Sequence, residues 1–492
     1  MKRRGMSLTR QRLKYVASDF VTTSVSFFLF NICRYHILHN ELPASWSLSE
    51  FLSLPKLLWE QALIPVAMLA VYWLSGYYNR PFERSRLNEF INTFYSALFN
   101  ATLIFFILLI NDRGPVVSAD YLLICVSFLL LLLFTYSGRL LITSSAFRRA
   151  RKKNIRNNIL IIGTSIQGHK IYDRLIRSKV LIKYNIVGFI HIEGVPKSKF
   201  CGLPCWNVQE IENICRNHEI HQIILAPDRD KDSLVLGMLD RLFPLDIPIK
   251  IMPDTLSYVT SSIRLTDILG EPFIDLTTPP LNDCASNIKL TFDVILSSLA
   301  LVALSPLMAI LAIGVRLSST GPVFYRQERI GKKRKPFYIY KFRSMRNDAE
   351  KCGPMLSSSA DARVTPFGRL MRKYRLDELP QFWNVLKGDM SIVGPRPERD
   401  FYIRQIIKKA PYYCLVFQVK PGITSWGMVK FGYASDIRQM VERTKFDLLY
   451  ITNMSLPLDI KIMIYTIRTI VRGAGEVQHS LAQGGLACAA VA

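Results

Sequence analysis

Two adjacent carboxylates, Asp377 and Glu378, lie in a segment that is otherwise rich in arginine. Arg372 and Arg375 precede the pair, and Arg396 follows it between two prolines, in the turn Gly-Pro-Arg-Pro. Guanidinium groups bind phosphate oxygens in pairs, and flanking prolines would fix Arg396 at low entropic cost. Acids among cations should be ionised, so they can share a divalent ion with a diphosphate, and an ionised Asp can attack phosphorus. These residue types suit phosphoryl transfer.

Two further cations, Lys341 and Arg343, lie upstream in the sequence KFRSM. A simpler interpretation competes with chemistry, because a basic surface beside a membrane can carry incidental acids. Adjacent acids at a helix start are usually solvated or compensate the helix dipole. On residue types alone, we rank this simpler interpretation first.

The composition points to a membrane protein with basic faces. The chain has 492 residues, of which 50% are hydrophobic, and 63 Lys and Arg face 38 Asp and Glu. This length predicts roughly three domains. A soluble nucleic-acid binder is rarely so apolar, so we expect no nucleic-acid partner. The nine cysteines show no regular framework and are expected to be reduced thiols.

Residues 1–147 are predicted to form a domain of four transmembrane helices. Each apolar segment is long enough to cross a bilayer core, and the segments lie near 14–38, 57–78, 89–111 and 118–146. Lys and Arg gather before the first segment, between the second and third, and after the fourth, which places both ends of this domain in the cytoplasm. Three polar residues within the segments, Asp19, Asn92 and Asn100, should face the bundle interior.

Residues 157–280 alternate apolar strands with helices, which predicts a Rossmann-like α/β domain with a parallel sheet. Its first turn reads Gly163-Thr-Ser-Ile-Gln-Gly168 and lacks the middle glycine of the dinucleotide fingerprint. We therefore rank a structural or regulatory role above a working dinucleotide site, and a loosely bound nucleotide stays open.

The apolar segment 290–317 is interrupted at its middle by Ser305-Pro306. Proline predicts a kink or break, and the Ser305 hydroxyl can satisfy a carbonyl that the proline frees. On this stretch alone a kinked spanning helix leads. However, Asp293 and Arg316 near its two ends can share one interface, and the region after it is dense in Lys and Arg. Both features favour a re-entrant hairpin that returns the chain to the cytoplasm.

The last third, 289–475, is predicted to be an α-rich α+β domain that includes this hairpin. We expect a short strand at 336–343, a helix after Pro380, and an amphipathic stretch at 446–471 that packs on the protein or lies on the membrane. Residues 476–492 are expected to be a tail.

The region 289–475 resembles the sugar transferase domain of the bacterial polyprenyl-phosphate sugar-phosphate transferase family, the monotopic phosphoglycosyl transferases. The four-helix domain and degenerate nucleotide fold resemble the front end of large members that start capsule, exopolysaccharide or O-antigen repeat units. The matching stretches are Phe324-Tyr-Arg-Gln-Glu-Arg-Ile-Gly331, Pro336-Phe-Tyr-Ile-Tyr-Lys-Phe-Arg-Ser-Met345, Leu376-Asp-Glu-Leu-Pro-Gln381, Asn384-Val-Leu-Lys-Gly-Asp-Met-Ser-Ile-Val-Gly-Pro-Arg-Pro397 and Lys420-Pro-Gly-Ile-Thr424.

This resemblance implies transfer of a hexose-1-phosphate from a UDP-sugar to undecaprenyl phosphate, with release of UMP. By analogy with large members, we expect UDP-glucose or UDP-galactose. The resemblance implies that Asp377 is the nucleophile of an aspartyl-phosphosugar intermediate and that Glu378 assists it, with Mg²⁺ held by both. It also implies that the substrate is contacted by Lys341, Arg343, Arg375, Arg396 and, less directly matched, Asp447.

The family's Ser-Pro break matches Ser305-Pro306, which implies a re-entrant helix in the bacterial inner membrane and a catalytic domain on the cytoplasmic face, in contact with membrane lipids. The chain departs from the family at Thr424-Ser-Trp-Gly-Met-Val429, where many members read Thr-Gly-Trp-Ala-Gln-Val. The resemblance therefore assigns no sugar or lipid contact in this stretch.

Two rival functions are considered. A membrane-tethered nucleotide-sugar dehydratase would need an intact glycine fingerprint and a Tyr-x-x-x-Lys pair, and the chain has neither. A non-catalytic scaffold of polysaccharide assembly would tolerate loss of the Asp377 carboxylate. We also consider a homodimer, although no residue pattern specifies one.

Overall fold

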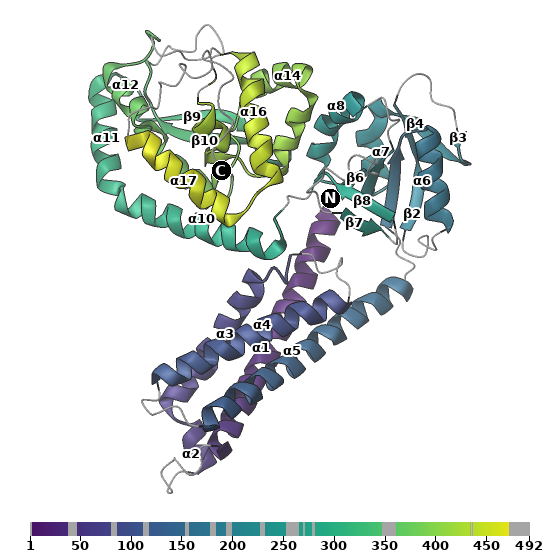
Figure 1. The fold of residues 1–492 in the computed structure, drawn as a ribbon, viewed down its shortest axis with the longest axis vertical. Coiled ribbons are helices and arrows are strands. Elements are labelled where there is room, and N and C mark those ends of the chain that lie inside the picture. The colour runs from purple at the N-terminus through teal and green to yellow at the C-terminus, as the bar shows by residue number, and fades with distance from the viewer. Residues whose placement is uncertain are drawn as a thin grey trace, which may run out of the picture. The chain divides into compact units, whose positions relative to one another are not determined.

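We describe a computed structural model of the chain, which has two compact units (Figure 1). The first unit comprises residues 1–155 and 282–288, and the second comprises residues 156–281 and 289–492. The structure describes residues 2–37, 47–79, 86–111, 118–152, 157–177, 184–192, 199–226, 232–251, 265–268, 271–277, 281–346, 361–432, 434 and 436–471.

The first unit is a bundle of long helices, in which α1 packs against α3 and α5, and α4 packs against α5 (Figure 1). All four predicted apolar segments form helices that are long and apolar enough to cross a membrane. Among the described residues, the same criteria select one more helix, α10. The bundle consists of α1 (Lys2–Ile37), the short α2 (Leu48–Leu52), α3 (Pro55–Leu74), α4 (Arg86–Asn111) and α5 (Ser118–Lys152).

Polar side chains meet inside this bundle. Asp19 and Asn100 are buried as predicted, whereas Asn92 is only half-buried and bonds to Ser75. The partner of Asp19, which the sequence did not predict, is the fully buried Arg139. The Arg139 Nε lies 3.0 Å from Asp19 Oδ1, and Nη2 lies 2.7 Å from Oδ2. The available signal was that Arg139 is the one Lys or Arg in the segment 118–146.

The second unit begins with a mixed eight-stranded sheet, in the order β3-β4-β2-β1-β5-β6-β8-β7. The predicted parallel arrangement is right for its five central strands: β1 (Asn157–Ile162), β2 (Tyr184–His191), β4 (Leu203–Asn207), β5 (Gln222–Leu225) and β6 (Ile249–Ile251). Antiparallel strands at its two edges depart from that prediction: β3 (Lys199–Phe200), β7 (Leu265–Ile268) and β8 (Glu271–Asp275).

Helices α6 (Ile166–Arg177), α7 (Ile211–Asn217) and α8 (Asp232–Leu242) accompany the sheet, and the short η3 (Phe243–Leu245) extends α8. Gly163 ends β1 with a φ of +123°, and a Cβ there would lie 2.2 Å from the Ala226 carbonyl oxygen. Glycine at this position therefore allows the end of β1 to approach the end of β5 closely.

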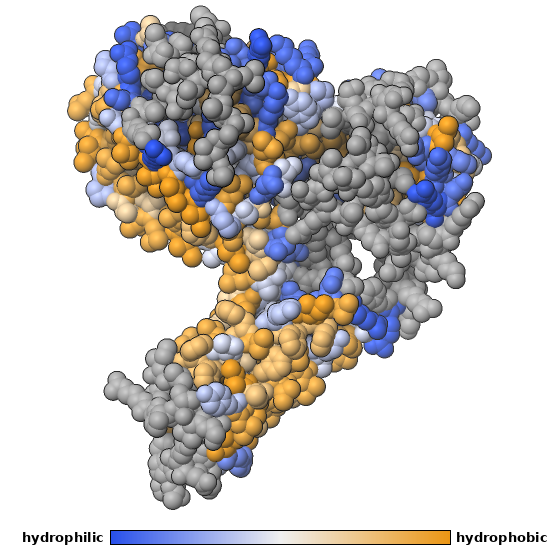
Figure 2. Space-filling view, in the orientation of Figure 1, coloured by the Kyte–Doolittle hydropathy of each residue, from blue (hydrophilic) through white to orange (hydrophobic). Residues whose placement is uncertain are grey.

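The predicted break at Ser305-Pro306 separates two helices, α10 (Asp283–Ala303) and α11 (Ser305–Ser318). The chain changes direction sharply between them (Figure 1). Pro306 lies in the first turn of α11, where its missing N–H costs nothing. The Ser305 hydroxyl donates to the Val302 carbonyl at 2.8 Å, which is the compensation that the sequence predicted. Apolar side chains such as Leu299, Val302 and Ile310 are exposed on this pair of helices (Figure 2).

The remainder of the second unit is α-rich with short sheets, as predicted. Strands β9 (Phe324–Ile330) and β10 (Pro336–Phe342) form an antiparallel hairpin, and β11 (Ser391–Val393) pairs in parallel with β12 (Gly422–Thr424). The helices are α12 (Pro366–Lys373), η5 (Leu376–Glu378), α13 (Gln381–Lys387), α14 (Asp400–Lys409), η6 (Pro411–Gln418), α15 (Trp426–Lys430), α16 (Ile437–Thr452) and α17 (Leu456–Val471).

Two of these elements confirm sequence predictions, because β10 matches the strand at 336–343 and α13 follows Pro380. The stretch 446–471 is not continuous, since Asn453 ends α16 and α17 begins at Leu456. On α17, Ile460, Ile464, Ile467 and Val471 are exposed, and on α16 Leu449 is exposed. The predicted tail, 476–492, lies outside the described residues.

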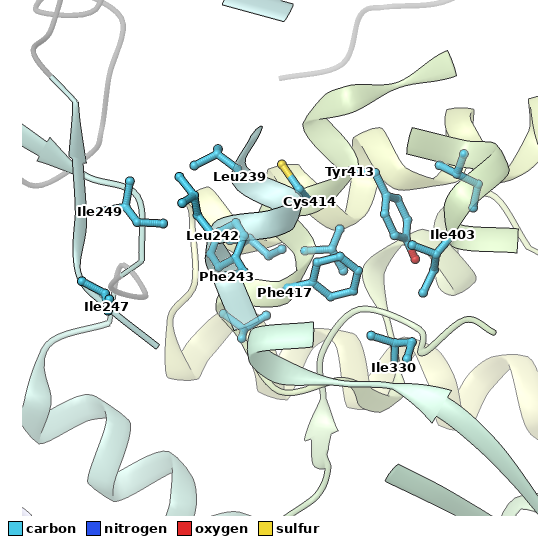
Figure 3. Packing of buried hydrophobic residues seen from close by; sticks show 14 of the residues in the cluster. Leu239, Leu242, Phe243, Ile247, Ile249, Ile330, Ile403, Tyr413, Cys414 and Phe417 are labelled. Carbon is cyan, nitrogen blue, oxygen red and sulfur yellow. The ribbon is translucent and has the colours of Figure 1, made fainter. Parts of the chain in front are cut away.

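The regions predicted as separate domains, 157–280 and 289–475, share one hydrophobic core. Leu239, Leu242 and Phe243 of α8 and η3 belong to the same buried cluster as Cys414 and Phe417 of η6 (Figure 3). The sheet region is thus packed on the last third of the chain.

Candidate active site

Asp377 and Glu378 lie in η5, in the short connection between α12 and α13. Arg375 ends the preceding turn in the left-handed region, with a φ of +55°, and so redirects the chain before the two acids. Both side chains are buried, at 8% and 5% relative exposure. The simpler interpretation, in which the pair is solvated on a basic surface, is therefore wrong for these residues.

Glu378 is surrounded by three cations. Lys341 Nζ lies 2.8 Å from its Oε1 and Arg396 Nη2 lies 3.5 Å from the same oxygen, while Arg375 Nη2 lies 3.1 Å from Oε2. Burial alone would raise the pKa of Glu378, but Arg375, Lys341 and Arg396 hold that pKa well below its ordinary value. Glu378 is therefore the fixed anionic centre of the site.

Asp377 has a different environment, although it is the neighbouring residue. Among the described residues, none donates a hydrogen bond to its carboxylate. Burial raises the pKa of Asp377, the Glu378 charge raises it further, and Lys341 lowers it in part. Glu378 is thus held by cations, whereas the carboxylate oxygens of Asp377 accept no hydrogen bond from the described residues. A carboxylate nucleophile needs oxygens of the second kind.

Two of the predicted substrate contacts do not touch the acids. Arg343 is buried at the end of β10, where its Nη2 donates to the Ser319 carbonyl at 2.6 Å. Its Nε and Nη1 have no hydrogen-bond partner in the described part of the chain. Asp447 is buried in α16 and accepts from the Gly427 backbone N–H at 3.0 Å. The structure therefore brings Lys341, Arg375 and Arg396 to the pair, but not these two.

Asp447 is connected to the site through α15. By accepting from Gly427 it fixes the start of this helix, and the next residue, Met428, contacts two of the cations. The Met428 Sδ lies 3.3 Å from Arg375 Nη2 and 3.1 Å from Arg396 Nη1. A thioether is a weak acceptor, so it leaves these guanidinium groups ready for a stronger one. Met428 is also the position at which the chain departs from the common Gln.

The buried Asp447 makes stability depend on pH, because burial raises its pKa to about 6 from an ordinary 3.8. The free-energy cost of burying the Asp447 charge is absent below about pH 4, where the carboxyl is protonated in both the folded and the unfolded protein. This cost reaches its full value above about pH 6, where the carboxyl is ionised in both. Asp447→Asn removes this titration and keeps an acceptor for Gly427. We expect the stability of D447N relative to the wild type to rise by about 1 kcal/mol from pH 5 to pH 7. Denaturation of both proteins in detergent at the two pH values measures it, and a constant or falling difference would contradict it.

The turn that carries Arg396 is held by residues that sequence analysis missed. Glu398 is buried between Arg443 Nη2, at 2.6 Å from its Oε1, and Arg329 Nη1, at 3.3 Å from its Oε2. Arg329 also donates to the Pro397 carbonyl at 3.1 Å. The signal was the position of Glu398 directly after Pro397, in the same motif.

A second group fixes β11, which leads into this turn. Lys289 Nζ donates to the Val393 carbonyl at 3.1 Å and to Asp459 Oδ2 at 2.7 Å. The Tyr450 hydroxyl donates to Asp459 Oδ1 at 2.7 Å. These residues come from α10, α16 and α17, so no local sequence pattern joins them.

Asp377 and Glu378 suit Mg²⁺ only if substrate phosphates supply the other ligands. Within the described ranges, no group of three His, Cys, Asp or Glu side chains is placed to hold a metal. Mg²⁺ is commonly bound through one or two carboxylates plus substrate phosphates, and Asp377 and Glu378 fit that mode. Because Glu378 is engaged by cations, Asp377 offers the freer oxygens.

Comparison with known proteins gives a consistent result. Residues 284–473 match the family model described as bacterial sugar transferase. The chain is 33% identical over 295 residues to the UDP-glucose:undecaprenyl-phosphate glucose-1-phosphate transferase of Escherichia coli (strain K12), a match that covers 59% of this chain and 63% of the relative. It is 45% identical over 188 residues to the UDP-N-acetylgalactosamine-undecaprenyl-phosphate N-acetylgalactosaminephosphotransferase of Aeromonas hydrophila, covering 38% of this chain and 44% of the relative.

These matches span less than two thirds of either relative. A third relative is matched over nearly its whole length: the uncharacterized sugar transferase EpsL of Bacillus subtilis (strain 168) is 36% identical over 198 residues, which are 40% of this chain and 94% of the relative. The family match contains the whole buried site around Asp377 and Glu378. The chain therefore belongs to the bacterial sugar transferase family, the polyprenyl-phosphate sugar-phosphate transferases.

Proposed function

We propose that this protein transfers a hexose-1-phosphate from a UDP-sugar to undecaprenyl phosphate and releases UMP, as the first step of exopolysaccharide, capsule or O-antigen repeat-unit synthesis. The observation that carries the proposal is the buried acid pair, in which Glu378 is held by three cations and Asp377 is uncommitted. The names of the relatives support a UDP-sugar and undecaprenyl phosphate as substrates, with glucose or N-acetylgalactosamine as the sugar in those proteins.

In the first step, an oxygen of the Asp377 carboxylate attacks the phosphorus that bears the sugar. The bond from that phosphorus to the bridging oxygen of UMP breaks, and UMP leaves with the electron pair. An aspartyl-phosphosugar remains on the protein. Burial and the Glu378 charge raise the pKa of Asp377, whereas Lys341, Arg372 and Arg375 lower it, so these cations favour the ionised carboxylate that attacks.

In the second step, a phosphate oxygen of undecaprenyl phosphate attacks the same phosphorus, and the Asp377 carboxylate leaves unchanged. The product is a sugar joined to undecaprenol by a diphosphate. Two displacements at one phosphorus need the same charge stabilisation twice, which a fixed set of cations supplies without reorganisation.

Lys341, Arg375 and Arg396 are the groups that would stabilise the diphosphate. In the structure they contact Glu378, and the two arginines also contact Met428. Ammonium and guanidinium groups both bind phosphate oxygens through charge-assisted hydrogen bonds. Bound Mg²⁺ would be held by Asp377 and Glu378 and would neutralise phosphate charge. Arg343, whose Nε and Nη1 have no partner among the described residues, is a further candidate for binding an anionic group.

The membrane elements support the same function, because the lipid acceptor carries its phosphate at the headgroup level and UDP-sugars are cytoplasmic. We propose that α10 and α11 form a hairpin that enters and leaves the inner membrane on its cytoplasmic side. The Ser305 hydrogen bond supports this, since it satisfies a carbonyl at the break where lipid offers no partner.

Labelling of single cysteines tests the hairpin. Ala285→Cys in the first turn of α10 and Tyr325→Cys after α11, with native cysteines replaced, should react with an impermeant maleimide from the same side of the membrane. The reason is that a re-entrant segment returns the chain to the leaflet it came from. Labelling of the two positions from opposite sides would exclude a hairpin and favour a spanning helix.

An assay of UMP release tests the proposed function as a whole. Purified protein is incubated with undecaprenyl phosphate, Mg²⁺ and each of UDP-glucose, UDP-galactose, UDP-N-acetylglucosamine and UDP-N-acetylgalactosamine. One or two of these donors should release UMP and give a lipid-linked product. Absence of UMP release with all four would favour the non-catalytic scaffold.

A further inference from the structure

The hairpin β9–β10 is closed by a turn whose backbone is unusual for its residues. In this turn, η4 (Lys332–Arg334), the Lys335 N–H donates to the Lys332 carbonyl at 3.3 Å. The two central residues, Lys333 and Arg334, have φ of +57° and +56°. This is the pattern of a type I′ turn, for which Asn-Gly is the favoured pair. Lys and Arg in this conformation are strained, so the surroundings must hold it.

The same two side chains contact the α/β region. Lys333 pairs with Asp246, which follows η3 and itself has a φ of +56°, and Arg334 pairs with Asp240 of α8. The other end of the Arg334 guanidinium lies 3.2 Å from Asp400 Oδ1 in α14. The elements α8 and η3 also share an apolar core with η6 (Figure 3). The strained turn is therefore held by side-chain contacts to a different part of the chain.

The two strands that leave this turn both reach the active site. On β10, Lys341 contacts Glu378, and the buried Asn384 fixes the strand beside it by bonds to the Tyr340 N–H and the Tyr338 carbonyl. On β9, Arg329 bonds to the Pro397 carbonyl and to Glu398, directly after Arg396. Two of the three cations around Glu378 are thus attached to the hairpin.

We infer that the α/β region positions Lys341 and Arg396 by holding the β9–β10 turn, and that Arg334 is the positioning residue at this contact. The inference rests on the proposed function, since it concerns the placement of those cations during transfer. It gives the region 157–280 a role that requires no bound nucleotide, which agrees with the missing middle glycine of its fingerprint.

Full-length variants test this inference. Arg334→Ala should lower kcat for UMP release on the order of tenfold with little change in KM, because small misplacement of catalytic groups mainly affects the reacting geometry. Arg404→Ala is the matched control, since Arg404 also pairs with Asp400 but is exposed and contacts no residue of the α/β region in the described structure. R404A should keep the wild-type kcat.

A replacement of the turn residues distinguishes the effect of the turn conformation from the effect of its ion pairs with the α/β region. K333N/R334G removes both ion pairs but supplies residues that adopt the I′ turn without strain. It should restore kcat to within about twofold of the wild type. A wild-type kcat in R334A, or an equal loss in R334A and K333N/R334G, would overturn the inference.

Hydrogen exchange gives a second readout that does not depend on activity. Amides of β9 and β10 should exchange faster in R334A than in the wild type and should regain protection in K333N/R334G. If the wild type releases no UMP with any donor, the proposed function fails while exchange still decides the role of the turn. Unchanged exchange in R334A would refute that role.

Discussion

Asp377→Asn is expected to lower the rate of UMP release by at least about 1,000-fold and to abolish any covalent phosphosugar adduct. The amide has the shape of the carboxylate but lacks its nucleophilic oxygen. The wild type should release about one equivalent of UMP from its UDP-sugar without undecaprenyl phosphate, because the first displacement does not need the acceptor. Rapid-quench measurement of UMP and mass spectrometry of the protein detect both effects.

Asp436→Asn is the matched control for this variant. Asp436 caps α16 by accepting from the Gln439 N–H at 2.8 Å, and Asn caps helices about as well. It should therefore leave the UMP burst intact. A wild type that releases no UMP until the acceptor is added, and that carries no adduct, would contradict the covalent route and support direct transfer between the two substrates.

Glu378→Gln is expected to be the second severe variant, because it removes the one charge that three cations share. Breaking a buried ion pair from one side costs about 3 to 5 kcal/mol of stability. Loss of the fixed geometry of Lys341 and Arg396 should also lower the transfer rate by about 100-fold. Chemical denaturation in detergent measures the first effect, and the UMP assay measures the second.

Inorganic phosphate provides a diagnostic for this variant. If Lys341, Arg375 and Arg396 form an anion site, phosphate should stabilise E378Q more than the wild type, since it replaces the lost charge. Glu442→Gln serves as the control, because Glu442 pairs with Lys445 at the surface and should change stability by no more than about 0.5 kcal/mol. Wild-type stability and rate in E378Q would show that Glu378 is not the centre of the site.

Local sequence signals predicted much of this molecule. Helix length and apolar content located the long helices, and the chemistry of Ser305-Pro306 predicted both the break and the hydroxyl that compensates it. The acid pair and the arginines around it were also found, because they are neighbours in the sequence. Residue types alone did not show that Asp377 and Glu378 are buried. The roles of the two acids were predicted from the family resemblance.

The features that sequence analysis missed depend on contacts between distant segments. Glu398 is explained only when Arg329 and Arg443 are seen on either side of it, 69 and 45 residues away. Asp447 is predicted to contact the substrate, and its contact with the Gly427 N–H, next to the Met428 that touches the cations, had no local signal. The packing of 157–280 on η6 had no signal either, because apolar positions show that a surface is buried but not what covers it.

The ion pair inside the helix bundle has a consequence for biosynthesis. Asp19 lies in the first long helix, and its partner Arg139 is made 120 residues later, in the last one. An unpaired charge in the hydrocarbon core of a bilayer is costly. Asp19 can therefore form this ion pair only after the ribosome has made α5, so the pair joins the first of these four long helices to be synthesised to the last.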